Sequence, residues 1–179
     1  MILSCKEEER AYMPDPTDSS TTYNWPEAEF VKQTSDAENA TLQWSVFPEL
    51  KSTLASIPQA DLNRIRTQTK KLTRYSDSLR KRMPATLQTK PISARLDVVY
   101  ARVALLDLSA NSLQVDSLEL RENYEESLTA FNILLHQINE KFEKDAIQKQ
   151  EGINYSREVQ QRLRDSIFKV EQSKQKKQP

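Results

Sequence analysis

The chain has 179 residues, which suits one domain with tails but is too short for two comfortable domains. Its 26 basic and 26 acidic residues cancel, so no overall field attracts nucleic acid, and we expect no nucleic-acid partner. The single glycine argues against sheets and phosphate loops, and the single cysteine excludes an internal disulfide. The composition therefore predicts an all-α protein.

Residues 6–34 contain three prolines and a polar string without a sustained hydrophobic period. Such a segment buries too little apolar surface to offset the entropy of ordering, so we predict an extended tether. Tyr23 and Trp25 interrupt the polar string. We expect these two aromatic residues to pack back onto the domain rather than to form a docking motif for a partner.

A helical pattern begins at Ser35, where Ser35 and Glu38 have the spacing of a capping box. Apolar residues follow at helical intervals as far as Ile57. Pro48 interrupts this pattern, because proline removes a backbone donor and clashes with the preceding turn. We therefore expect a kink or a break near Phe47.

The second predicted helix covers residues 62–83 and repeats its inward positions at alternating steps of three and four residues. This spacing is typical of helices that pack at a shallow angle. Thr69 and Ser76 are the polar members of the seam. We expect each hydroxyl to bond to a carbonyl one turn back, which permits close contact between helices.

The third predicted helix covers residues 91–113, with Pro91 in its first turn. Val98, Leu105 and Leu108 widen its apolar surface, and this width predicts the most buried helix of the protein. Its inward seam consists of Ile92, Leu96, Val99, Val103, Leu106, Ala110 and Leu113.

The fourth predicted helix starts at an Asp116 cap and carries an apolar stripe to Phe142. Since short loops make consecutive helices antiparallel, the pattern predicts an up-down-up-down four-helix bundle over residues 35–150.

Residues 151–179 are predicted to form a C-terminal helix and a basic tail. Beyond Phe142 the inward positions become polar, so this stretch does not bury itself in an apolar core. Either the fourth helix continues, which the good helix formers on both sides of Gly152 favour, or Gly152 breaks it and a fifth helix folds elsewhere. The candidate partner-binding residues are Val159, Leu163, Ile167 and Val170.

Residues that carry out catalysis or hold metals are not grouped in the sequence. His136 and Glu140 share one helix face, but two ligands do not make a transition-metal site. Cys5 has no histidine nearby that would activate a thiol nucleophile. We therefore expect no metal site, no cofactor and no enzymatic activity.

The string ILSC at residues 2–5 resembles the lipobox of bacterial lipoproteins. This resemblance implies that Cys5 carries lipid, which would anchor the protein to a membrane, and that residues 1–5 are the remnant of a lipoprotein signal. A signal peptide has a charged start and an apolar stretch, yet only MILS precedes Cys5. The resemblance therefore requires an upstream start or a shortened chain, and otherwise Cys5 is an ordinary cytosolic thiol.

Lys6, Glu7, Glu8 and Glu9 resemble the surface-export signal of lipoproteins from the phylum Bacteroidota. This resemblance implies an outer-membrane protein that faces the cell surface, with the periplasmic face as the second choice.

These features predict a lipid-anchored helical binding or assembly protein of the bacterial cell envelope. An accessory subunit of an outer-membrane protein complex fits this description, with a protein partner in the envelope. One alternative is a helical bundle that binds a small ligand between its third and fourth helices. The other, if Cys5 is not acylated, is a cytosolic helical adaptor.

Overall fold

The computed structural model describes residue 23 and residues 25–175, with side chains described as far as residue 166. The regular elements are α1 (Ser35–Leu42), α2 (Phe47–Ser56), α3 (Leu62–Lys81), the short 3₁₀ helix η1 (Ala85–Leu87), α4 (Lys90–Ala110) and α5 (Ser117–Gln175). The predicted all-α class is thus confirmed. The chain divides into two compact units, Met1–Gln137 and Ile138–Pro179.

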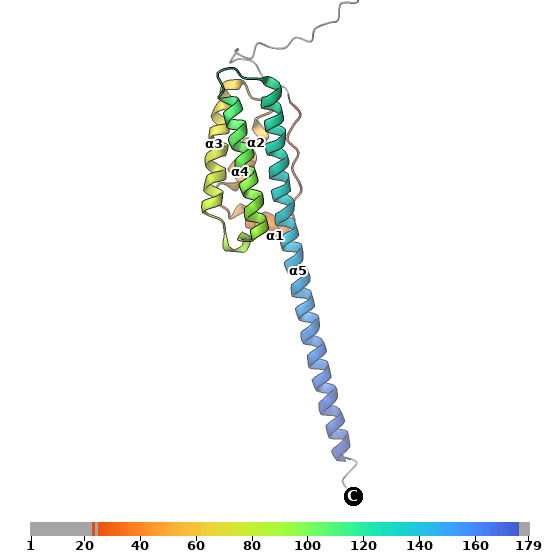
Figure 1. Ribbon diagram of the computed structural model, residues 1–179. Coiled ribbons are helices and arrows are strands. Elements are labelled where there is room, and N and C mark those ends of the chain that lie inside the picture. The colour runs from red at the N-terminus through yellow and green to blue at the C-terminus, as the bar shows by residue number, and fades with distance from the viewer. Residues whose placement is uncertain (1–22, 24, 176–179) are drawn as a thin grey trace, which may run out of the picture. The chain divides into compact units, whose positions relative to one another are not determined.

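In the first unit, α3 and α4 lie side by side and run in opposite directions (Figure 1). The Thr69 hydroxyl of α3 donates to Asp107 Oδ1 of α4 over 2.6 Å. One end of the pair is joined by the contact of Arg80 with Asp97, at 2.7 Å. Because residue numbers rise along α3 as they fall along α4, the two contacts establish the antiparallel direction.

The first part of α5 runs antiparallel to α2 and closes the bundle. The Tyr124 hydroxyl donates to the carbonyl of Leu54 over 3.3 Å, and the rings of Phe47 and Phe131 lie 5.3 Å apart. Since α2 and α3 also pack together, α2, α3, α4 and the first part of α5 form the predicted up-down-up-down bundle. Its core includes the fully buried Val99, Val103 and Leu106.

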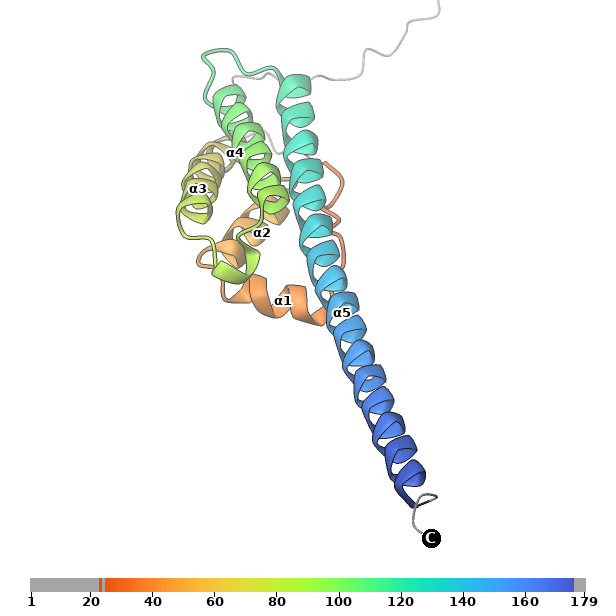
Figure 2. The same cartoon turned by 60° about the horizontal axis from the view of Figure 1, so that its bottom comes forward.

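The predicted break near Phe47 is confirmed, because α1 and α2 are separate helices. Val46 between them has φ 59° and ψ 11°, the left-handed conformation. Figure 2 shows α1 lying across the end of the bundle near the α3–α4 connection. The predicted Ser35 cap is shifted by one residue, since the Thr34 hydroxyl accepts the hydrogen bond from the Ala37 amide at 3.4 Å.

The segment before α1 packs against the bundle, as expected for Tyr23 and Trp25. Both aromatic residues are buried, and the Trp25 ring stacks on Tyr124 with 5.5 Å between centroids. Further along, the Val31 amide donates to Asn132 Oδ1 over 3.0 Å. Residues 25–34 contain no helix, but they are fixed to α5 rather than hanging as a free tether.

The prediction that Val98, Leu105 and Leu108 widen the buried face of α4 is wrong. These side chains are 44%, 45% and 70% exposed, and Leu113 lies fully exposed in the following loop. The neighbouring helices cover only the inner row of α4, whereas the second apolar row points away from them. A bundle helix packed on one side leaves its other side in solvent.

In the second unit, α5 continues as one helix through Gly152. This confirms continuation rather than a break, and a Cβ atom at Gly152 would meet nothing within 4 Å. Every side chain from residue 143 to residue 166 is exposed. The compact unit that holds the bundle ends at Gln137.

Candidate protein-binding surfaces

The exposed stretch of α5 carries apolar side chains that have no cover in the second unit. Val159 is 37% exposed and Leu163 is 58% exposed, and Ile147, Ile153 and Tyr155 are exposed as well. Polar neighbours four residues apart support the helix itself, as in the Lys141–Asp145 ion pair at 2.6 Å. An apolar row on such a helix is stabilised further only when another surface covers it.

The predicted binding row is thus described in part. Val159 and Leu163 are exposed, as a partner-binding surface requires. Ile167 and Val170 belong to α5, but their side chains lie outside the described residues.

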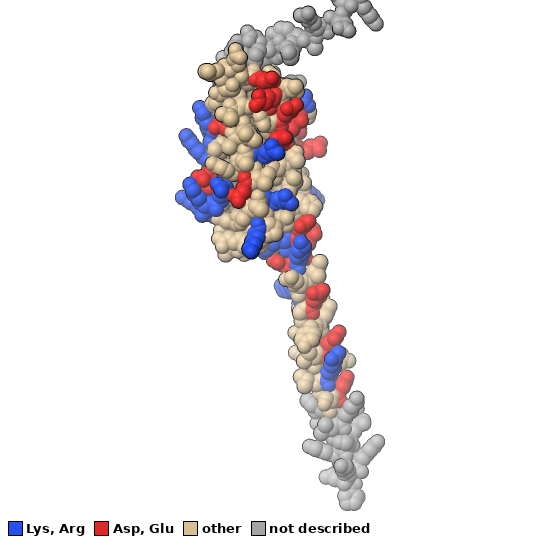
Figure 3. Space-filling model, viewed as in Figure 1, with Lys and Arg blue, Asp and Glu red and all other residues tan. Residues whose placement is uncertain are grey.

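A second exposed apolar row lies on α4 and was not anticipated as a surface. Its members are Ala94, Val98, Ala101, Leu105 and Leu108. Figure 3 shows a mainly uncharged face over α4, with acidic side chains above it at the start of α5. The row therefore offers an apolar contact surface bordered by charge.

A groove of about 440 Å³ runs beside this row, between α4 and the start of α5. Val98 and the exposed Ile133 give it an apolar floor, while Arg102, Glu122 and Glu126 supply charge. Arg102 and Glu126 bond to each other at 2.5 Å. The groove is open to solvent and lined mainly by helix-surface residues, so it suits a protein side chain better than an enclosed small molecule.

Basic residues gather on the solvent face of α3. Lys70, Lys71 and Arg74 are exposed, and none of them forms an ion pair with another described residue. Acidic residues gather instead at the start of α5. Figure 3 shows the basic side chains in blue over the α3 side and the acidic side chains in red over the start of α5. The zero net charge of the chain therefore conceals a separation of charge across the bundle.

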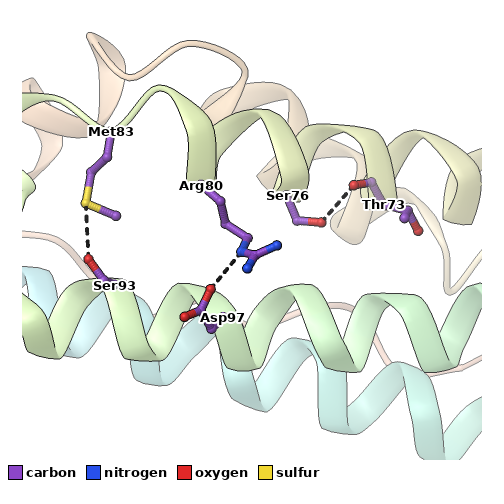
Figure 4. A network of polar contacts seen from close by, with 6 residues as sticks. All are labelled: Thr73, Ser76, Arg80, Met83, Ser93 and Asp97. Atoms are coloured by element: carbon purple, nitrogen blue, oxygen red, sulfur yellow. Dashed lines mark hydrogen bonds and ion pairs between the residues drawn. The ribbon is translucent and has the colours of Figure 1, made fainter.

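Polar contacts between the ends of α3 and α4 fix how these helices meet (Figure 4). Arg80 pairs with Asp97, and its guanidinium also lies 4.6 Å from the centroid of the Tyr100 ring. Nearby, the Ser93 hydroxyl donates to the sulfur of Met83 over 3.8 Å. Arg80, Ser93 and Asp97 are exposed, and each has a partner within this group of residues, which is the pattern of a structural contact rather than a reactive site.

Tyr124 is the described residue whose pKa clearly departs from its usual value. Burial, and secondarily the carboxylate of Glu125, raises the pKa of Tyr124 to about 12. Its hydroxyl bonds to a backbone carbonyl, and its ring stacks on Trp25. This residue therefore holds the N-terminal segment and α2 against α5, and its raised pKa follows from packing.

Several sequence-based candidates lie outside the described residues, namely Cys5, Lys6, Glu7, Glu8 and Glu9. His136 is exposed on α5. Among the described residues, no group of three or more histidine, cysteine, aspartate or glutamate side chains is arranged to hold a metal ion. No helix in this part of the chain combines the length and apolar character needed to cross a membrane.

The fold and surfaces define an all-helical bundle protein in which two apolar helix faces, on α4 and α5, are exposed among the described residues. Comparison of the chain with models of protein families, with curated proteins and with solved structures gave no match.

The α4 row was not predicted as a surface, because its larger members Val98, Leu105 and Leu108 were assigned to one wide buried face. A signal for it was present in the sequence, since α4 carries two apolar series offset by two residues. The inner series includes Ile92, Leu96 and Val99, and the outer series includes Ala94 and Val98. Two such series mark two different helix faces, and a bundle of this size covers only one.

Proposed function

We propose that this protein is a lipid-anchored binding or assembly protein of the bacterial cell envelope, an accessory subunit of an outer-membrane protein complex. The observation that carries the binding role is the uncovered row on α5, with Val159 and Leu163 exposed among polar neighbours. Burying apolar surface lowers the free energy by about 25 cal/mol per Å², so binding of a partner helix or groove over this row is favourable.

The envelope location rests on the sequence around Cys5. The ILSC string supports acylation of that thiol, and Lys6 with the glutamates that follow supports export to the surface. A single acyl chain binds membranes only marginally, so stable anchoring depends on the several chains that a lipoprotein cysteine carries or on added protein contacts.

The location is tested by expressing the protein from its own chromosomal locus, with all upstream DNA retained. We expect the parent protein in the outer-membrane fraction with a lipid mass on Cys5, and Cys5→Ala as a folded protein in the soluble fraction. An unmodified thiol at Cys5 in the membrane-extracted parent would contradict the lipid anchor.

The binding role is tested by placing a photo-crosslinking amino acid at position 163 in those cells. We expect a discrete crosslinked product that disappears when Val159→Asp is added. The matched control carries the same amino acid at position 67, an exposed site on α3. Equal crosslinking at positions 163 and 67 would mean that the α5 row has no specific partner.

A further inference from the structure

The exposed row of α4 has the spacing of a helix-pairing seam. Its five residues follow one another at steps of four, three, four and three. This is the spacing by which side chains of one helix fit between those of another. The inner seam of α4 has the same spacing and is buried by the bundle, whereas the outer seam has no cover in the described part of the chain.

The row is also nearly symmetric about its middle residue, Ala101. Ala94 and Leu108 lie seven residues to either side, and Val98 and Leu105 lie three and four residues away. An antiparallel two-fold pairing centred on Ala101 would therefore place Leu108 of one copy against Ala94 of the other. Large residues would meet small ones, and alanine at the axis allows the backbones to approach closely.

Charges beside the row complement each other across the same axis. Arg95 and Glu122 are exposed, and neither forms an ion pair with another described residue. Arg95 and Arg102 are seven residues apart, so they lie on the same side of α4, the side on which α5 lies. The ion pair between Arg102 and Glu126 shows that these two residues lie at the same height along the antiparallel helices α4 and α5.

The two-fold pairing would bring Arg95 of the second copy close to Glu122 of the first copy. Arg95 and Asp107 lie six residues to either side of Ala101, so Arg95 of one copy stands level with Asp107 of the other. Arg102 is level with Glu126, and the two helices are antiparallel. Asp107, five residues further along α4, is therefore level with Arg121, which immediately precedes Glu122 on α5. In a two-fold antiparallel pair the same sides of the helices meet, so Arg95 would enter the groove beside Glu122.

We propose that two copies of this protein pair through the outer faces of their α4 helices, antiparallel about Ala101. Arg95 of each copy then enters the α4–α5 groove of the other copy and pairs with Glu122. This contact uses the outer face of α4 in the bundle, and it leaves the α5 row at Val159 and Leu163 available for a different partner. The inference therefore stands apart from the proposed function and from any lipid on Cys5.

The mass of the full chain in solution tests the pairing, measured by light scattering at about 100 µM, where even micromolar affinity gives a dimer. We expect twice the monomer mass for the parent and the monomer mass for Leu105→Glu. Leu113→Glu is the matched control, because Leu113 is an exposed leucine off the row. It should remain dimeric. A monomeric parent would overturn the proposal, as would a dimer that survives Leu105→Glu.

Charge reversal tests the predicted partner of Arg95. Arg95→Glu and Glu122→Arg should each weaken the dimer at least tenfold, and the double variant should regain most of that loss. Both residues are exposed, so each variant should keep the helical circular dichroism of the parent. Failure of the double variant to recover would overturn the assigned pairing.

A disulfide at the axis fixes the geometry. In a Cys5→Ala background, Ala101→Cys should oxidise to a covalent dimer, because the two Cβ atoms face each other across the axis. Thr67→Cys on the exposed face of α3 is the control and should remain largely reduced. Equal dimer formation by the two variants would overturn the proposed interface. Loss of the parent dimer through Leu163→Asp would assign the contact to α5 and also overturn the proposal.

Discussion

Several core residues combine apolar packing with hydrogen bonds that provide partners for their buried polar atoms. The buried indole of Trp44 donates to the Leu79 carbonyl over 3.3 Å, and the buried Ser76 hydroxyl donates to the Leu72 carbonyl over 2.9 Å. Buried polar groups cost free energy unless they are bonded, so these contacts allow close packing around them.

Tyr124 gives the protein a pH dependence at high pH. The pKa of this phenol is about 12 in the folded state, compared with an ordinary value of 10.0. The folded state therefore binds the phenol proton more tightly than the unfolded state does. The resulting contribution to the free energy of unfolding is complete below about pH 10 and is lost as the pH rises to about 12. We expect the parent to lose more stability than Tyr124→Phe between about pH 9 and about pH 11.

Urea denaturation of both proteins at the two pH values measures this effect. The remaining tyrosines occur in both proteins and cancel in the comparison. A stability difference between parent and variant that stays constant with pH would contradict the predicted proton linkage.

Val46 stores strain at the turn between α1 and α2. A β-branched residue at φ 59° costs roughly 1–2 kcal/mol, and glycine adopts this conformation without a steric penalty. We therefore expect Val46→Gly to raise the free energy of unfolding by about 0.5–1 kcal/mol. Ala104→Gly, in the interior of α4, should lower it by about 1 kcal/mol. Thermal unfolding of both variants checks the opposite signs, and destabilisation by Val46→Gly would mean that its side-chain contacts outweigh the strain.

At the scale of elements, α5 belongs to two different environments. Its residues up to Gln137 complete the bundle, and those from residue 143 to residue 166 expose all their side chains. The sequence change behind this is the loss of apolar residues at inward positions, which become Asp145 and Lys149. A charged side chain without a partner is stable only in contact with water.

Aspartate substitutions separate the two environments. Val103→Asp places an unpaired carboxylate in the core and should lower the free energy of unfolding by about 3 kcal/mol or more. Leu163→Asp changes an exposed side chain and should lower it by less than about 0.5 kcal/mol. Urea denaturation followed by tryptophan fluorescence reports on the bundle, since Trp44 is fully buried. Equal destabilisation would place Leu163 in a packed core and remove it as a binding candidate.

For the whole molecule, we propose separate tasks for separate parts. In this proposal a lipid on Cys5 anchors the protein to the membrane, the bundle pairs with a second copy, and the α5 row binds a partner. The segment of residues 25–34 joins these tasks mechanically, because its backbone is bonded to Asn132 of α5. The N-terminal lipid would therefore sit on a chain that is fixed to the bundle from Trp25 onward.

The acidic stretch after Cys5 is predicted to direct export. Replacing Glu7, Glu8 and Glu9 by alanine should leave the protein anchored but confined to the periplasmic side. These residues precede the described part of the bundle, so its stability should change by less than about 0.5 kcal/mol. Protease digestion of intact cells measures exposure, with a periplasmic lipoprotein as the control. Equal digestion of variant and parent would show that the stretch does not carry the export information.

Local rules in the sequence determined the helices and their antiparallel order. Pro48 breaks the first helical pattern and the Asp116 cap begins α5, as its carboxylate accepts the Leu118 amide at 2.8 Å. Only the tertiary structure decided which apolar row of α4 is covered and that Trp25 packs on Tyr124. Hydrophobic spacing shows that a face is apolar, but burial depends on which neighbours reach it, and those neighbours come from distant parts of the chain.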